Sequence, residues 1–153
     1  MAYDAAHNVT NESVGYGSAS AQVWHYTWHT NQTPASVTDP EGNSIEYDST
    51  AGGALSEMRE FPAQGVTLTT RYGYTTNGLL AAVTNANGHS VAYGHDPNGY
   101  VSEVDSQAGP TVTYSNNVLG HVEKIILPGA SGDRVTDFTV NPLGQILGID
   151  YPD

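Results

Sequence analysis

The seven residues YGHDPNG (93–99) fit both a chemical site and a reversal of the chain. Tyr93, His95 and Asp96 are residue types that general acid–base catalysis uses. The last four letters, DPNG, also suit a tight turn, because proline presets a φ of about −65° and asparagine and glycine tolerate positive φ. The remainder of the sequence decides between these two interpretations.

An internal repeat runs through the sequence and includes this stretch. An aromatic residue stands six positions before each of six turn residues, which are Gln32, Gly53, Gly78, Gly99, Gly120 and Gly144. The aromatic residues are Tyr26, Tyr47, Tyr72, Tyr93, Tyr114 and Phe138. A second series of glycines falls between the first: Gly42, Gly65, Gly88, Gly109 and Gly132. Successive markers are about 10 to 13 residues apart, which predicts a chain reversal at each of them.

The repeat favours the turn interpretation of residues 93–99. A position that accepts many residue types within one molecule is not a shared catalytic position. The sequence therefore predicts a turn at 96–99 and no catalytic residue. The positions equivalent to His95 in the other copies hold Trp28, Ser49, Tyr74, Asn116 and Val140.

The segments between the turns have the length and patterning of β-strands. Val91 and Tyr93 alternate with other residues, as do Val112 and Tyr114, which gives one apolar face. Turns at this spacing imply antiparallel hairpins. The sequence therefore predicts an all-β fold of antiparallel β-hairpin repeats that form a curved sheet, a solenoid or a shell segment.

Two details of the pattern refine this prediction. Residues 54–60 (ALSEMRE) contain good helix formers, but Leu55 and Met58 keep the register of the repeat, so we expect a strand there. In the alternate strands the apolar residues are three positions apart, which indicates a β-bulge or bend that would curve the sheet. The pairs are Leu80/Val83, Val101/Val104 and Val122/Ile125.

Stacked hairpins would align the six aromatic residues into a structural ladder. A buried ring removes about 150 Å² or more from water, which stabilises the fold by up to roughly 4 kcal/mol, so we expect the rings to form a packed core. A row of exposed rings could instead bind sugars by stacking. The sequence does not decide between these two roles, so no binding residue is assigned.

These repeats resemble the YD repeat of the Rhs family. The stretches that carry the resemblance are YDAAHNVTNES (3–13), SVTDPEGNSIEYD (36–48) and YGYTTNGLLAAVTNANGHSVAY (72–93). The Tyr-Asp pair itself is kept at Asp48, whereas Gly73, Gly94 and Ser115 follow their tyrosines instead. The resemblance implies stacked hairpins of the kind found in large secreted or surface proteins. There the repeats wind into a hollow shell, which encloses a toxic domain in bacterial toxins and serves cell adhesion in animal teneurins.

The repeat predicts that residues 1–153 form a single array of about seven YD-type units, with His7 at the first turn position. This number of units is too small to close a shell, and the sequence shows neither a toxin domain nor an autoproteolysis motif. It also shows no capping unit at either end, and repeat arrays need caps because a terminal unit leaves open hydrogen bonds and apolar surface. We therefore expect a homo-oligomer that forms through the repeat ends or the apolar sheet face.

Composition excludes several classes of function. The chain has 4 basic and 16 acidic residues and a net charge of −12, so nucleic acid is not an expected partner. It has no cysteine, hence no disulfide and no thiolate chemistry. No run of 18 apolar residues would span a membrane, and no basic segment followed by an apolar segment predicts a signal peptide.

Other motifs are weak. His25 and His29 on a strand would lie about 13 Å apart, too far to share a metal ion. Asn8, Asn11 and Asn31 begin glycosylation triplets, which arise by chance in such a sequence. No cofactor or nucleotide motif is present, and no EF-hand loop. Scattered carboxylates could still bind Ca²⁺ through oxygen ligands: Asp39, Glu41, Glu46 and Asp48.

The sequence thus favours a non-catalytic, extracellular or cell-surface structural protein of YD/Rhs repeats that assembles end to end with copies of itself into a filament or larger shell. The alternative is a carbohydrate- or surface-binding module of a larger Rhs-like toxin or adhesion protein. The two hypotheses differ in whether the aromatic rings are buried or exposed.

Overall fold

The computed structural model describes residues 1–15, 17 and 21–151, and within them it contains fourteen β-strands and no helix. The predicted all-β class is therefore confirmed. The chain divides into two compact units, Met1–Tyr72 and Gly73–Asp153. Each unit is described by itself below.

Unit 1 contains the first seven strands, of which β7 runs on for two residues beyond its boundary. The strands are β1 (Ala2–Tyr3), β2 (Val9–Val14), β3 (Gln22–Trp28), β4 (Pro34–Thr38), β5 (Ser44–Ser49), β6 (Leu55–Ala63) and β7 (Val66–Tyr74). Strand β6 covers the stretch with helix-forming residues, so the register of the repeat outweighs local propensity there, as predicted.

Unit 2 contains the other seven strands and repeats the same design. They are β8 (Leu80–Thr84), β9 (Ser90–His95), β10 (Val101–Ser106), β11 (Val112–Asn116), β12 (Val122–Leu127), β13 (Arg134–Val140) and β14 (Ile146–Asp150).

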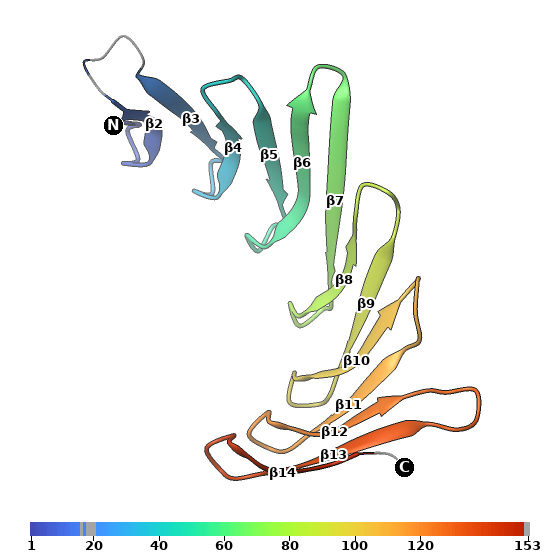
Figure 1. Cartoon of the computed structure of the whole chain (residues 1–153). Coiled ribbons are helices and arrows are strands. Elements are labelled where there is room, and N and C mark those ends of the chain that lie inside the picture. The colour runs from blue at the N-terminus through green and yellow to red at the C-terminus, as the bar shows by residue number, and fades with distance from the viewer. Residues whose placement is uncertain (16, 18–20, 152–153) are drawn as a thin grey trace. The chain divides into compact units, whose positions relative to one another are not determined.

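Within each unit the strand order is the chain order, and the neighbouring strands are antiparallel (Figure 1). A strand contacts only the strands that precede and follow it in the sequence. Each unit is therefore an open meander of hairpins, because turns come too often for any strand to reach a more distant partner.

Two of the three predicted bulges are present, those at Val101/Val104 and Val122/Ile125. The pairing of β10 with β9 shifts register between Val101 and Glu103, and the pairing of β12 with β11 shifts beyond Lys124, so that Val122 lies opposite Asn116. An extra residue at these points turns apolar side chains three positions apart onto the same face. Unit 1 has corresponding shifts at the starts of β4 and β6.

The turns owe their geometry to residues with positive φ. Eleven of the predicted turn positions take such a φ, and His7 and Gln32 do so without being glycine. In the usual pattern the amide of the left-handed residue donates to the carbonyl three residues earlier, as in Gly99 N to Asp96 O at 2.9 Å. This is a type I turn followed by a left-handed residue, a common hairpin connection. Gly109 makes the same bond to Ser106 but does not have a positive φ.

The turn that holds Asp96 also explains why that residue is a carboxylate. Its Oδ1 accepts hydrogen bonds from the amides of Asn98 at 2.9 Å and Tyr100 at 3.0 Å. Asn85, Asn117 and Asn141 accept equivalent pairs of bonds in their turns. A short side-chain acceptor at the start of the turn accepts hydrogen bonds from amides that lose their backbone partners at the chain reversal.

No described residue is buried, whether apolar or polar. The expectation of a packed core of rings was therefore wrong, since all six ladder residues are only half-buried. The physical reason is that each unit is one layer of sheet, and a single layer covers each side chain only from its flanks.

Candidate functional site

Each unit has one side that we call the aromatic face, defined by its ladder rings. In an antiparallel pair, residues opposite each other in register share a face. In unit 1, Tyr26 lies opposite Val37, which lies opposite Ile45, and Tyr47 lies opposite Met58. The rings therefore occupy alternate strands, with an aliphatic residue facing each of them.

The aromatic face of unit 2 follows the same rule. Tyr93 lies opposite Val104, Tyr114 opposite Ile125, and Phe138 opposite Ile149. In these five pairs, an apolar residue five positions after the turn residue thus covers the ring of the preceding strand. This pairing of ring and aliphatic side chain, rather than ring on ring, is the cross-strand contact of the repeat.

A groove of about 580 Å³ opens on the aromatic face of unit 1. The three rings in its lining come from Tyr26, Trp28 and Tyr47. Glu12 is the one lining residue with a charged side chain. The other lining residues are small or aliphatic and include Val9, Pro34, Val37 and Leu55.

Hydrogen bonds hold the groove's rings in place. The Trp28 Nε1 donates to the carbonyl of Val9 at 2.8 Å, and the Tyr26 hydroxyl donates to Glu12 Oε2 at 3.1 Å. Desolvation raises the pKa of Tyr26, and the hydrogen bond and negative charge of Glu12 raise it further. The indole and the phenol are therefore fixed before any ligand arrives.

The opposite face of unit 1 carries an ion-pair cluster centred on Arg59. Its Nη1 lies 2.6 Å from both Asp48 Oδ2 and Glu57 Oε1, and its Nη2 lies 3.1 Å from Glu46 Oε2. Arg71 adds a bond from its Nε to Glu57 at 2.8 Å. Hydrogen bonds to Asp48, Glu57 and Glu46 raise the pKa of Arg59. Both basic side chains of unit 1 are thus engaged on this face.

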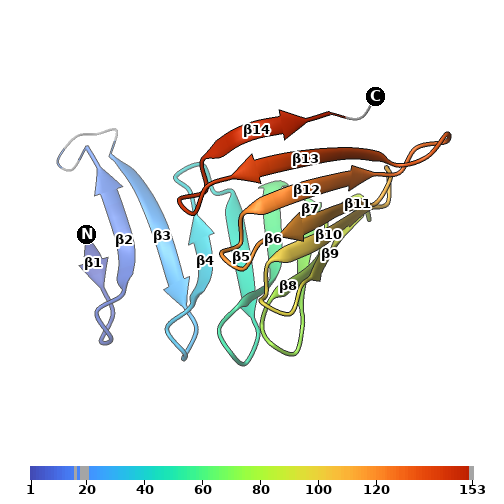
Figure 2. The same ribbon diagram turned by 90° about the horizontal axis from the view of Figure 1, so that it is seen from below.

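The hairpin loops after β1, β3 and β5 lie along the same edge of unit 1 (Figure 2), and we call such a series of loops the turn row. At the first two of these loops, the residue after the left-handed position contacts the left-handed residue of the next turn in the row. Asn8 Nδ2 donates to Gln32 Oε1 at 2.7 Å, and the Thr33 methyl group lies against Gly53.

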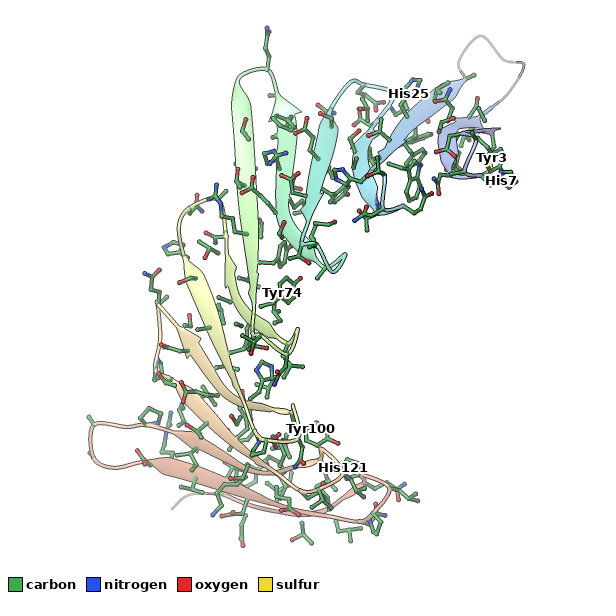
Figure 3. All side chains as sticks on the ribbon, turned by 180° about the vertical axis from the view of Figure 1, so that it is seen from behind. Tyr3, His7, His25, Tyr74, Tyr100 and His121 are labelled. Atoms are coloured by element: carbon green, nitrogen blue, oxygen red, sulfur yellow. The ribbon has the colours of Figure 1, made fainter. Side chains whose placement is uncertain are left out.

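Unit 2 continues this rule with larger side chains. Leu79 lies against Gly99, the Tyr100 ring lies on Gly120, and the His121 ring lies on Gly144. Tyr100 and His121 are adjacent at this edge in Figure 3. These contacts were not predicted from the sequence. The contacting residues share only their position directly after a turn marker, because their residue types differ.

The histidines form no metal site. His25 Nδ1 lies 2.9 Å from Asn11 Oδ1, whereas His29 Nε2 lies 2.8 Å from the carbonyl of Tyr47, so the two rings have separate partners. The described part of the chain contains no cluster of three potential metal ligands. Three of the four acidic residues considered for Ca²⁺ have other partners, since Asp39 caps a turn and Glu46 and Asp48 bind Arg59.

His95, the residue that raised the question of catalysis, lies at the end of β9 opposite Val101. The Nδ1 atom of His95 is enclosed and has no hydrogen-bond partner among the described residues. The same is true of the Nδ1 atom of His121. Asp96 directs its carboxylate to its own turn, so the three residue types of the opening stretch do not combine into a relay. The described residues also contain no apolar helix of membrane-spanning length.

Comparisons with known proteins agree with this architecture. Residues 74–111 match the family model of the RHS Repeat. A crystal structure of TcdB2-TccC3 aligns with a TM-score of 0.55 and 12% identity over 99% of this chain and 11% of that chain, and so does one of TcdB2-TccC3-TEV. A Tc holotoxin pore structure from Photorhabdus luminescens aligns with a TM-score of 0.48 and 13% identity over 88% and 9%. A search of curated proteins finds no match.

Residues 74–111 are therefore similar to an Rhs repeat, and the predicted resemblance to the Rhs family is confirmed. The likeness to the TcdB2-TccC3 structures shows the same fold. This chain spans about a tenth of the length of those chains.

Proposed function

We propose that the chain is a non-catalytic, extracellular structural protein: a wall of Rhs-type hairpins that is completed by assembly with further copies of itself. The observation that carries this proposal is the single-layer construction, in which no described residue is buried and each strand contacts only its neighbours. A one-layer sheet with an apolar face reaches its full stability only when further strands or another surface cover it.

The outer strands supply the contact through which copies would join. Ile146 and Leu147 on β14 expose 57% and 68% of their surface, and Tyr3 on β1 exposes 59%. Neither β1 nor β14 has a partner on its outer side within the described residues. Unpaired strand edges with exposed apolar side chains are templates for pairing with another chain, and a head-to-tail contact that does not close produces a filament.

In this proposal the aromatic residues and the turn glycines have structural roles in a single array of about seven repeats over residues 1–153. The six rings join adjacent strands, and the ten glycines permit the reversals. Structures of TcdB2-TccC3 contain this fold within much longer chains, which supports a role as part of a larger assembly.

Sedimentation equilibrium tests the proposal. The average mass of the wild-type protein is expected to rise with concentration well beyond that of a monomer. Ile149→Lys on β14 should hold the protein close to the monomer, because a charge on the apolar face of an edge strand opposes pairing. Val118→Lys, at an exposed turn, is the matched control and should assemble like the wild type. A monomeric wild type at all concentrations would refute the proposal.

A further inference from the structure

The groove on the aromatic face of unit 1 combines three rings, two of them held by hydrogen bonds, with one carboxylate. Its volume of about 580 Å³ falls in the range that accepts a small organic molecule. Tyr26, Trp28 and Tyr47 supply the aromatic surface, and Glu12 supplies the negative charge. We propose that this groove binds a small organic cation with an apolar body, such as an aryl- or alkylammonium ion.

The charges of unit 1 favour a cation. Glu12 forms no ion pair among the described residues, and neither does Glu60, which lies opposite Ile45 on the same face. Arg59 and Arg71 are both engaged with carboxylates on the opposite face. The side chains of the aromatic face of unit 1 therefore carry negative charge that no basic side chain compensates, in a protein whose net charge is −12. Such a surface attracts cations and repels anions.

The rings favour a cation that is poorly hydrated. Aromatic faces attract ammonium groups within about 6 Å of the ring centre, and indole is the strongest of the three types. The bonds of Trp28 to Val9 and of Tyr26 to Glu12 order these rings without a ligand. A pre-ordered site loses little conformational entropy on binding.

The hydroxyl groups around the groove argue against a sugar. Thr27 Oγ1 and Ser36 Oγ lie 2.6 Å apart and bond to each other, and Ser49 Oγ donates to Thr33 Oγ1 at 3.3 Å. The indole N–H of Trp28 is occupied as well. A sugar requires several free donors and acceptors, whereas a quaternary ammonium ion requires none.

Isothermal titration calorimetry with benzyltrimethylammonium tests the site on the full chain at low ionic strength. We expect one site in unit 1 and affinity at least about tenfold higher than for neopentylbenzene, the neutral molecule of the same shape, since each factor of ten corresponds to about 1.4 kcal/mol. Glu12→Gln should weaken binding of the cation by roughly tenfold. Trp28→Leu should weaken it by a similar factor.

Two matched variants control for net charge and for the loss of an indole. Glu60→Gln removes the same charge from the same face outside the groove, and Trp24→Leu removes the other tryptophan, which does not line it. Both should change the affinity by less than about twofold. Circular dichroism identifies any variant that fails to fold, and for Trp28 the milder Trp28→Phe then replaces Trp28→Leu.

Three results would overturn the proposal. The first is equal affinity for the charged and the neutral probe. The second is an equal loss of affinity in Glu12→Gln and Glu60→Gln, which would indicate attraction by net charge alone. The third is binding of a neutral oligosaccharide, such as cellotetraose, at the groove in preference to the cation. None of these results depends on whether the chain assembles end to end.

Discussion

Glycines of the hairpin turns differ in what surrounds them, which predicts different costs of substitution. Gly88 and Gly120 both have φ near +80°, but a Cβ at position 88 would meet nothing within 4 Å, whereas a Cβ at 120 would lie 2.7 Å from the Tyr100 Cζ. Gly88→Ala should destabilise by about 1–2 kcal/mol through left-handed strain alone. Gly120→Ala should cost about 2–4 kcal/mol because the ring must also move.

Urea unfolding followed by circular dichroism measures both glycine variants. Tyr100→Ala added to Gly120→Ala should recover part of the difference, because the colliding ring is gone. Equal costs for Gly88→Ala and Gly120→Ala would contradict the stacking of Tyr100 on the next turn.

The side-chain acceptor at a turn start has a separate, smaller effect. Asn117 Oδ1 accepts from the amides of Leu119 and His121, each at 3.0 Å. Asn117→Ala should destabilise by about 1–2 kcal/mol, because each lost bond is worth roughly 0.5–1.5 kcal/mol. Asn117→Asp keeps the acceptor and should stay within about 0.5 kcal/mol of wild type. Hydrogen exchange at the His121 amide reads out the local effect, and similar exchange in the two variants would refute it.

Asp39 makes one turn sensitive to pH. The side-chain amide of Asn43, 2.8 Å from Oδ2, lowers the pKa of Asp39 below its ordinary value of 3.8, and the backbone amide of Asn43 contributes in the same direction. A lowered pKa gives stability that is present above the ordinary value and lost as pH falls through the folded-state value.

Asn43→Ala should therefore raise the pKa of Asp39 toward 3.8, since the largest cause of the shift is removed. Titration of the Asp39 carboxyl by NMR measures this directly. Asn31→Ala, in another turn, is the control and should leave the pKa of Asp39 unchanged. An unaltered pKa in Asn43→Ala would show that the amide does not stabilise the charged form.

At the scale of elements, β5, β6 and β7 are joined by the Arg59 cluster. Arg59→Met would leave Glu46, Asp48 and Glu57 close together without their shared cation, so their repulsion should destabilise unit 1 at neutral pH. The loss should shrink in about 1 M NaCl, where dissolved ions screen the repulsion between the carboxylates. Lys124→Met breaks one exposed pair, with Asp137 at 3.2 Å, and should have little effect.

Thermal unfolding at pH 7, at low salt and in about 1 M NaCl, followed by tryptophan fluorescence, checks the Arg59 prediction, because both tryptophans are in unit 1. A loss of the same size at both salt concentrations would mean that Arg59 acts through the packing of its aliphatic chain rather than its charge.

Strands and bulges could be predicted from the sequence because they depend on local spacing. The three-residue gap between Val101 and Val104 is enough to place a bulge, since the alternation of faces is fixed. The turn row could not be predicted, because Asn8, Leu79 and His121 share a position but no chemistry, and only the offset between neighbouring hairpins shows what each one touches.

The candidate groove could not be predicted from the sequence either. Its lining combines residues from Val9 to Leu55, and a repeat pattern states which face they occupy but not where that face is hollow. The half-buried state of the rings was also missed, because periodicity cannot distinguish a sheet covered by a second layer from one left open.

At the scale of the whole molecule, the proposed assembly joins copies through their outer strands, so that the hairpin repeats continue from one copy to the next. The chain has no cysteine, so introduced cysteines report contacts without interference. Ala2→Cys on β1 and Asp150→Cys on β14, combined in one chain, would meet between copies if the edges pair, because disulfides need Cα atoms within about 7 Å.

Oxidative cross-linking of this double variant, followed by non-reducing electrophoresis, is the most direct test. End-to-end assembly predicts a ladder of species with increasing mass from the double variant. Either single variant should give no species larger than a dimer. A variant with Val118→Cys at an exposed turn in place of Asp150→Cys is the control and should give no ladder. Monomers alone, or the same ladder from the control, would contradict assembly through the outer strands.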